Sequence, residues 1–234
     1  PTSIRRGSSK MAGVVSTTLS GIRYLLNHLP EFWELLAEHM VLVIVSEMLA
    51  VSIAIPLGVI AARHEKLKSP ILSVGNVAQT IPPLAVIALM FPILGLGFLP
   101  SFVALFIYAL LPVMVNTITG LESVEEGTID AAKGMGMTQN ERLTKIRFPL
   151  ALPVIFAGIR TSTVINVGTA YLAFFIGGGG LGAWVISGIN LFNMPQVFAG
   201  AISGAVLAIS LDLILAAVEN RLGSTGPASA QVAA

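Results

Sequence analysis

The sequence predicts an all-α, polytopic membrane protein with about five transmembrane helices and one helical hairpin in water. Of its 234 residues, 55% are hydrophobic and only 11% are charged, whereas soluble domains average about 25% charged residues. The apolar residues gather in stretches long enough to cross a hydrocarbon core of ~30 Å at about 1.5 Å per residue. Residues 123–153 differ, because they carry a dense mixture of charges between two apolar spans.

Residues 1–38 are predicted to form an N-terminal tail followed by a helix at the membrane interface. The first ten residues have the composition of a disordered tail. Residues 19–38 combine many apolar side chains with three acidic ones, and Trp33 suits the headgroup region of a bilayer. The alternative is that residues 11–29 form a sixth span.

The transmembrane permease domain is expected over residues 39–218, followed by a C-terminal tail over residues 219–234. Five spans are expected, at residues 39–62, 69–94, 97–119, 153–176 and 196–218. Pro82 and Pro83 interrupt the second span, and Pro112 interrupts the third. Such breaks are tolerated where neighbouring helices bond the freed carbonyl groups. These spans are therefore expected to face protein or a pore rather than lipid.

The basic residues predict the orientation of these spans. They concentrate in the loops after the first and third spans: Arg63, Lys66 and Lys68, then Lys133, Arg142, Lys145 and Arg147. The loop at Gly95 and the loop over residues 177–195 contain no Lys or Arg. The positive-inside rule makes the basic loops and the C-terminus cytoplasmic, in a multi-pass protein of the cell membrane. Five spans leave Arg5, Arg6 and Lys10 outside, whereas six spans would place them inside.

The charged stretch predicts two short helices. Ser123 with Glu126, and Thr138 with Glu141, match the capping box that marks a helix start. The helices are therefore expected at residues 124–135 and 139–147, the second ending before Pro149. Gly134 and Gly136 lie at their junction. A helical hairpin (residues 123–149) between membrane spans is typical of a docking element for a partner.

This hairpin resembles the cytoplasmic signature of ABC importer permeases: Glu-Ala-Ala, three residues, Gly, nine residues, Ile-x-Leu-Pro. Asp130-Ala131-Ala132, Gly136 and Ile146-Arg147-Phe148-Pro149 reproduce that spacing, with Asp for Glu and Phe for Leu. The resemblance implies a binding-protein-dependent permease of type I, whose hairpin docks in a groove of a separate cytoplasmic ATPase subunit. The residues expected to couple to that ATPase are Asp130, Ala131, Ala132, Gly134, Gly136, Ile146 and Pro149.

Residues 50–222 also resemble the osmoprotectant permeases, the glycine betaine, carnitine and choline group. The matching stretches are Ile55-Pro56-Leu57-Gly58, Gln79-Thr80-Ile81-Pro82-Pro83-Leu84-Ala85 and Phe175-Ile176-Gly177-Gly178-Gly179-Gly180-Leu181-Gly182. This resemblance implies quaternary ammonium solutes as cargo. It also implies a second permease copy or paralogue, an external solute-binding protein, surrounding membrane lipid, and ATP bound only on the partner subunit.

The aromatic residues argue that the cargo is selected elsewhere. An aromatic cage holds a quaternary ammonium by cation–π contacts. The Trp and Tyr residues of this chain are scattered along the sequence: Tyr24, Trp33, Tyr108, Tyr171 and Trp184. No cage is expected in this subunit, so the external binding protein is expected to choose the solute.

Polar residues inside spans are functional candidates, because burying them in lipid is unfavourable. Glu47 is the only acid well inside a span. The candidates for a translocation path or gate are Glu47, Asn76, Gln79, Thr80, Pro82, Pro83, Asn166, Thr169, Gly177, Gly178, Gly179 and Gly180. The alternatives are helix–helix hydrogen bonds for the polar residues, a flexible loop for the glycines and an interfacial carboxylate for Glu47. Arg160, Asp212 and Glu219 are expected to pair with one another or to extend toward the membrane surface. Gly200 and Gly204 form a close-packing motif.

The sequence contains no residue pattern typical of metal binding, phosphate-loop nucleotide binding, catalysis or nucleic-acid binding. The chain has no cysteine, and His28, His39 and His64 share no ligand spacing, so we predict no metal site. The glycine run at residues 177–182 lacks the Lys-Ser/Thr of a phosphate loop, and no catalytic set is present. A net charge of +1 does not indicate nucleic acid. The rivals are a permease for another small solute, such as an amino acid, and a gradient-driven secondary transporter.

Overall fold

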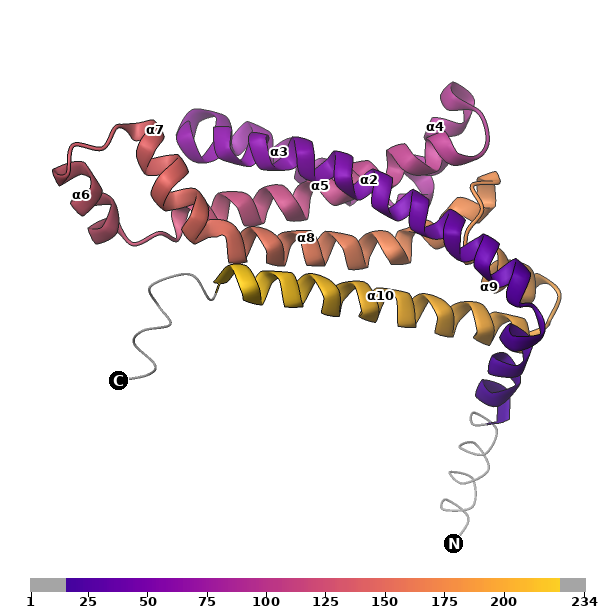
Figure 1. Cartoon of the computed structure of the whole chain (residues 1–234). Coiled ribbons are helices and arrows are strands. Elements are labelled where there is room, and N and C mark those ends of the chain that lie inside the picture. The colour runs from indigo at the N-terminus through magenta and orange to yellow at the C-terminus, as the bar shows by residue number, and fades with distance from the viewer. Residues whose placement is uncertain (1–15, 224–234) are drawn as a thin grey trace, which may run out of the picture.

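The computed structural model describes residues 16–223, and every regular element in that range is helical. A first helix covers residues 16–27. Figure 1 shows the long helices side by side along one common direction. The elements that follow the first helix are α2 (Leu29–Arg63), α3 (Glu65–Thr80), α4 (Pro83–Leu94), α5 (Phe98–Glu122), α6 (Glu126–Gly134), α7 (Gln139–Arg142), the π-helix η1 (Leu143–Arg147), α8 (Phe148–Ala170), the 3₁₀-helix η2 (Tyr171–Ile176), α9 (Gly182–Asn190) and α10 (Met194–Gly223).

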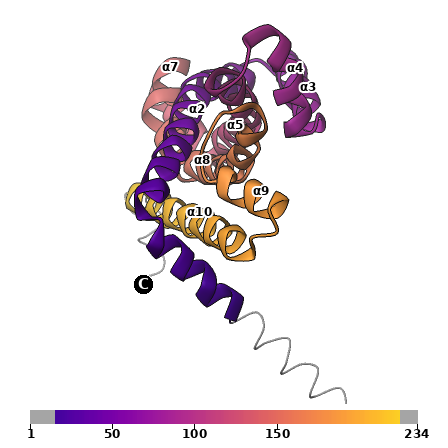
Figure 2. The ribbon, with the colours of Figure 1, turned by 90° about the vertical axis from the view of Figure 1, so that its right-hand side faces the viewer.

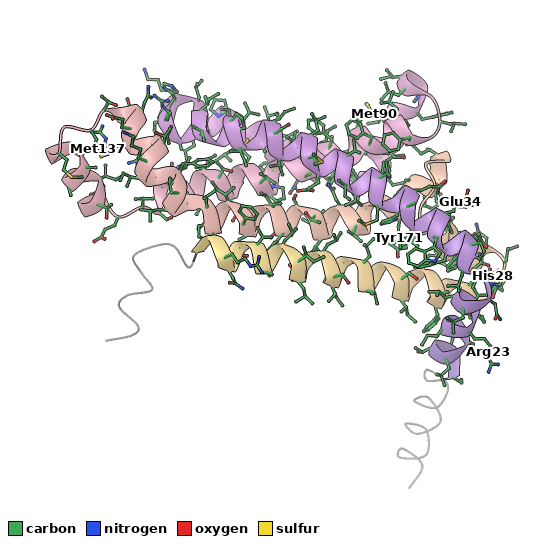
Figure 3. All side chains as sticks on the ribbon, viewed as in Figure 1. Arg23, His28, Glu34, Met90, Met137 and Tyr171 are labelled. Atoms are coloured by element: carbon green, nitrogen blue, oxygen red, sulfur yellow. The ribbon has the colours of Figure 1, made fainter. Side chains whose placement is uncertain are left out.

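The bundle has two distinct ends. Helices α6 and α7 lie at one end, which we call the hairpin end, together with the last turns of α10 (Figure 1). Residues 16–27 and α9 lie at the other, which we call the loop end. Figure 3 labels Met137 at the hairpin end and Arg23 and His28 at the loop end. The Arg63 guanidinium donates a hydrogen bond to Asn140 of α7, so both basic loops share the hairpin end.

The number of candidate membrane spans in the structure agrees with the number predicted from the sequence. Four helical segments of the described chain are long and apolar enough to cross a membrane: Leu29–Arg63, Phe98–Glu122, Gln139–Ile176 and Met194–Arg221. The pair α3 and α4 together makes a fifth candidate. The prediction of an all-α membrane protein with about five spans is confirmed.

The second span is a broken pair rather than one helix. Helices α3 and α4 meet at a bend of 92°. Ile81 lies between them with extended backbone angles of φ −79° and ψ 126°, because the proline that follows excludes the helical conformation. Pro82 and Pro83 have no N–H to continue the hydrogen bonds of α3, so the second proline starts a new helix.

The N-terminal segment differs from the prediction. The interfacial helix expected over residues 19–38 is interrupted at His28, and α2 then continues without a break from Leu29 to Arg63. The predicted boundary between residues 38 and 39 therefore falls inside a helix. Leu29-Pro30 provides the new start, because proline is favoured in the first helical turn. The alternative sixth span over residues 11–29 lies partly outside the described residues.

Helix α5 is the centre of the bundle. It packs against both α2 and α8, and α10 packs on the other side of α8, as Figure 2 shows from the loop end. Leu105, Ala109 and Val113 of α5 are fully buried. Helix α8 approaches α5 closely at Gly158, where an added Cβ would lie 2.5 Å from the Cβ of Asn116. The absence of a side chain there lets the two helices touch.

Candidate functional site

The hairpin between α5 and α8 consists of α6, a tight turn and α7. The turn closes with main-chain bonds from Gly136 to Lys133, at 2.9 Å, and from Met137 to Ala132, at 3.1 Å. Gly136 has a φ of +76°, a conformation that glycine adopts without a Cβ penalty. The chain therefore reverses where the sequence predicts it.

One of the two predicted capping boxes is present. The Thr138 hydroxyl accepts from the Glu141 N–H, and the Glu141 carboxylate accepts from the Thr138 N–H. The other prediction is wrong. Helix α5 extends to Glu122, and the Ser123 hydroxyl donates to the carbonyl of Gly120. Ser123 thus ends one helix and cannot cap the next, so α6 starts at Glu126 rather than at residue 124.

The second helix of the hairpin does not stop before Pro149. Helix α7 passes through the π-helix Leu143–Arg147 directly into α8, so the fourth span starts earlier than the predicted residue 153. The N–H of Phe148 bonds the carbonyl of Leu143, five residues back. This wider turn lies beside Pro149, which has no N–H and whose ring would collide with the carbonyl of an ordinary turn. The second helix of the hairpin and the fourth span therefore form one continuous helical segment.

The residues of the signature divide between two faces. Ala132 is buried together with Ile129, whereas Asp130, Ala131, Gly134 and Gly136 are exposed. Ile146 lies in the π-helix, and Pro149 lies in the first turn of α8. The Lys133 ammonium, 2.6 Å from Asp130, holds the pKa of that carboxyl below its ordinary value. The outer face of α6 therefore presents an ionised acid beside alanine and glycine.

Glu47, Ser162 and Asn166 form a buried cluster between α2 and α8. The Ser162 hydroxyl donates to one carboxylate oxygen of Glu47. The Asn166 amide donates to the other at 2.9 Å. Glu47 is 8% exposed, and the other two side chains are fully buried. The sequence reasoning missed Ser162, although its i, i+4 spacing from Asn166 places both on one helix face.

Gln79 bonds the main chain of a neighbouring helix. Its side-chain amide donates to the carbonyl of Tyr108 at 3.1 Å. That carbonyl would ordinarily receive the N–H of residue 112, which is proline. The freed carbonyl is thus bonded by a neighbouring helix, as the proline breaks require.

The other path candidates lie apart from this cluster. Asn76, Thr80 and Pro82 are exposed near the break between α3 and α4, and Pro83 starts α4. Thr169 is buried on α8, where its hydroxyl donates to the carbonyl of Ile165. The structure therefore separates the candidates into a buried group within the bundle and an exposed group along the broken helix.

The glycine-rich loop is attached to α2. The N–H of Gly180 donates to the Glu38 carboxylate at 2.8 Å. Gly177, Gly179 and Gly180 all have positive φ, and a Cβ on Gly179 would collide with the same carboxylate. Glu38, which was expected at the membrane interface, therefore holds the glycine-rich loop of the predicted gate against α2.

A second side-chain contact joins α2 to the segment that follows the glycine-rich loop. The indole N–H of Trp184 in α9 donates to Glu31 at 2.7 Å. Tyr24 and Phe32 pack around the same indole, at ring-centroid distances of 5.4 and 6.1 Å. Three aromatic residues therefore meet, although the sequence suggested scattered positions. Trp184 is only 1% exposed, so neighbouring side chains cover its faces and leave no room for a cation.

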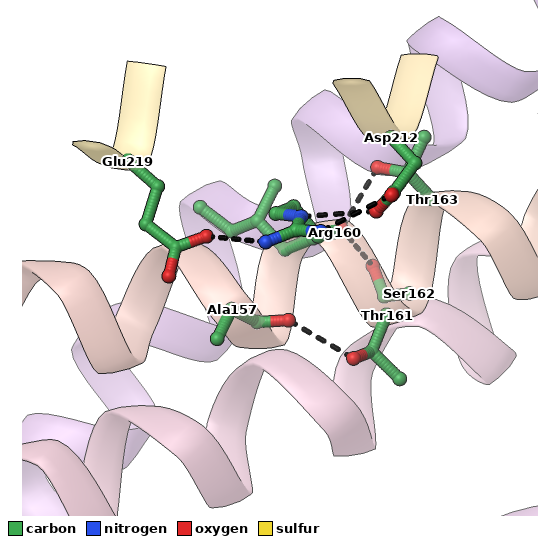
Figure 4. A network of polar contacts seen from close by, with 8 residues as sticks. Ala157, Arg160, Thr161, Ser162, Thr163, Asp212 and Glu219 are labelled. Carbon is green, nitrogen blue, oxygen red and sulfur yellow. Dashed lines mark hydrogen bonds and ion pairs between the residues drawn. The ribbon is translucent and has the colours of Figure 1, made fainter. Parts of the chain in front are cut away.

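The charged residues of α8 and α10 pair as predicted. The Arg160 guanidinium donates two hydrogen bonds to Asp212, at 2.9 and 3.1 Å, and one to Glu219, at 2.7 Å (Figure 4). Gly200 and Gly204 pack within the same subunit, against Trp184 and Tyr171 respectively. Among residues 16–223, no group of His, Cys, Asp and Glu side chains could hold a metal ion.

Comparison with known proteins places this architecture in context. Residues 54–224 match the family model described as "Binding-protein-dependent transport system inner membrane component". A choline transport system permease protein of Bacillus subtilis is 43% identical over 189 residues, which cover 81% of this chain and 87% of the relative. An osmoprotectant import permease protein of Salmonella typhimurium is 41% identical, with 83% and 93% coverage.

Solved structures show the same fold at lower sequence identity. The chain aligns with an inward-facing structure of a methionine ABC transporter at a TM-score of 0.75 and 20% identity, which covers 82% of this chain and 95% of that one. An amino acid ABC transporter crystallised with histidines aligns at a TM-score of 0.66 and 21% identity, with 85% and 97% coverage. At these identities the likeness concerns the fold alone.

Proposed function

Because the chain belongs to the family of binding-protein-dependent transport system inner membrane components, it is the permease subunit of an ABC importer, and we propose that it carries quaternary ammonium compatible solutes. Glycine betaine, carnitine and choline are the solutes meant. The family hydrolyses ATP in a separate ATPase subunit, so this chain is a transport subunit and not an enzyme. Family membership also excludes the gradient-driven transporter.

The observation that carries the cargo proposal is the agreement among the relatives. Permeases named for choline, for glycine betaine/carnitine/choline and for carnitine, from Bacillus subtilis and Listeria monocytogenes, are 38–43% identical to this chain. The amino acid transporters share the fold at about half that identity. The covered faces of Trp184 support selection of the solute by an external binding protein.

The hairpin is the proposed contact with the ATPase. The exposed Asp130 and Ala131 supply a face that a second surface can approach closely. Gly134 and Gly136 flank Met135, whose apolar side chain is 72% exposed at the turn. Ile146 and Pro149 connect this face to α8 through the π-helix. Movement of the docked hairpin would therefore pass into the fourth span without a flexible joint.

The proposed orientation puts the hairpin end and the C-terminus in the cytoplasm. The helices that meet at the hairpin end carry the basic residues expected on the cytoplasmic side by the positive-inside rule: Arg63, Lys66, Lys68, Lys133, Arg142, Lys145 and Arg147. The glycine loop then faces the external binding protein. Two permease copies, or this chain and a paralogue, would enclose the path in the surrounding membrane, with the exposed residues of α3 and α4 toward it.

Uptake measurements test the cargo. The chain is expressed with its ATPase and binding protein in cells that lack other importers for these solutes, and radiolabelled choline, glycine betaine and carnitine are supplied. At least one of them should accumulate, and accumulation should stop when the ATPase is inactivated. Methionine and histidine serve as matched controls. Uptake of either amino acid, with none of the quaternary amines transported, would overturn the cargo proposal and leave the permease assignment intact.

A further inference from the structure

A basic cavity lies between the end of α2 and the inner side of the hairpin. Its volume is about 230 Å³. Four of its lining side chains are basic and none is acidic. The lining residues are Ala62, Arg63, Ile129, Lys133, Gln139, Arg142, Leu143 and Arg147.

The positive charges in this cavity are largely uncompensated. Lys133 pairs with Asp130 outside the cavity. Arg63 and Arg142 bond neutral oxygens, those of the Asn140 amide at 2.9 Å and the Met137 carbonyl at 3.2 Å. The guanidinium of Arg147 has no hydrogen bond or ion pair with any side chain or carbonyl in the described range 16–223. Three guanidinium groups therefore line the cavity without a hydrogen-bonded carboxylate, and the acid whose charge acts on Arg142 is Asp130, which is bonded to Lys133.

The cavity is on the side of α6 away from the proposed ATPase contact. Ile129, which lines it, is 5% exposed and faces inward, whereas Asp130 and Ala131 face outward. Ala62 and Arg63 are the last residues of a helix long and apolar enough to cross a membrane. We therefore expect the cavity on the headgroup side of the hydrocarbon core.

We propose that this cavity binds a phosphoryl group. Guanidinium groups match phosphate oxygens with paired, charge-assisted hydrogen bonds, and they remain charged at every physiological pH. The volume accommodates a phosphoryl group with several waters, since a cavity that holds one water needs about 10–15 Å³. Either the headgroup of an anionic lipid or a soluble phosphate compound supplies that chemistry. The bound group connects α2 to the hairpin and so stabilises one position of the hairpin. This inference is independent of the cargo.

Native mass spectrometry of the assembled importer in detergent tests the proposal. One arm adds phosphatidylglycerol, a second adds phosphatidylcholine, and a third adds inorganic phosphate or pyrophosphate without lipid. The variants are Arg147→Gln and Lys133→Gln, with Arg147→Lys to restore the charge. Lys145→Gln is the matched control, because Lys145 lies in the same π-helix but pairs with Glu141 and does not line the cavity.

The proposal predicts adducts on the wild type and on Lys145→Gln. Arg147→Gln should weaken binding about tenfold through the loss of one charge-assisted contact, and Arg147→Lys should recover part of it. Adducts of phosphatidylglycerol but not phosphatidylcholine identify a lipid source, whereas adducts in the phosphate arm identify a soluble one. Equal adducts on all variants would overturn the proposal. Release of the ATPase by Arg147→Gln with no adduct on the wild type would also overturn it, because an acidic side chain of the ATPase would then fill the cavity.

Discussion

The side-chain amide of Gln79 bonds the main-chain carbonyl of Tyr108, the carbonyl that Pro112 leaves without a donor. A proline in one helix is thus compensated by a glutamine in another. Gln79 belongs to the Gln-Thr-Ile-Pro stretch that resembles osmoprotectant permeases. This hydrogen bond gives Gln79 a structural role that does not depend on which solute is transported.

Replacing Gln79 by Leu should destabilise the protein by about 1 kcal/mol, because a carbonyl inside the bundle loses its donor. Thermal unfolding in detergent measures the effect. In a Pro112→Ala background the N–H of residue 112 can bond Tyr108, so Gln79→Leu should become nearly neutral. Asn76→Leu is the control, since Asn76 is exposed on the same helix. An equal loss in both backgrounds would contradict this account.

Replacing Glu47 by Ala should cost about 1–3 kcal/mol, because the buried hydroxyl of Ser162 and the amide of Asn166 both lose their acceptor. Thermal unfolding should report the loss, while the KM for solute stays unchanged in the protein that remains folded. Glu34→Ala is the control, since Glu34 is exposed on the same helix. A raised KM with unchanged stability would instead make Glu47 part of the solute path.

Replacing Glu38 by Ala should release the glycine loop from α2, because Gly180 loses its acceptor. Faster hydrogen exchange over residues 177–182 is the expected result. Gly179→Ala should act similarly, since that position has a φ of +76° and faces the Glu38 carboxylate. Gly168→Ala is the control, because a Cβ there meets nothing within 4 Å. Unchanged exchange in both variants would show that other contacts hold the loop.

Gly136→Pro and Asp130→Lys should abolish co-purification of the ATPase from membranes while the permease still inserts. Proline cannot adopt the φ of +76° found at Gly136. The second variant reverses the charge on the outer face of α6 and leaves Lys133 without its acid. Gly127→Ala, at an exposed position of α6 where an added Cβ meets only the Glu125 carboxylate at 3.8 Å, should retain the ATPase. Retention of the ATPase by both Gly136→Pro and Asp130→Lys would remove the hairpin from the proposed contact.

Patterns of neighbouring residues in the sequence predicted only those features that contacts between neighbouring residues determine. The capping box of Thr138 and Glu141 formed because both partners lie within one turn. The box of Ser123 and Glu126 looked the same, but α5 extends to Glu122 and takes the hydroxyl of Ser123. Apolar length predicted the spans, and the double proline predicted the break between α3 and α4.

Contacts between residues far apart in the chain could not be predicted in this way. Glu47 and Asn166 are separated by 119 positions, and Glu38 and Gly180 by 142. Glu31 and Glu38 suggested an interface because nothing nearby in the sequence marks them as acceptors for α9 and the glycine loop. The basic cavity also combines α2 with the hairpin, so its charges converge only in the folded chain.

The π-helix between α7 and α8 makes a lever of the segment Gln139–Ile176. This segment is helical over 38 residues, with the hairpin at one end and the glycine loop directly after the other. A close contact with α5 is at Gly158, near the middle of the segment, where a pivot would be. A tilt about that point moves the two ends in opposite directions. An inward pull on the hairpin would therefore strain the bond between Glu38 and Gly180 on the far side of the membrane.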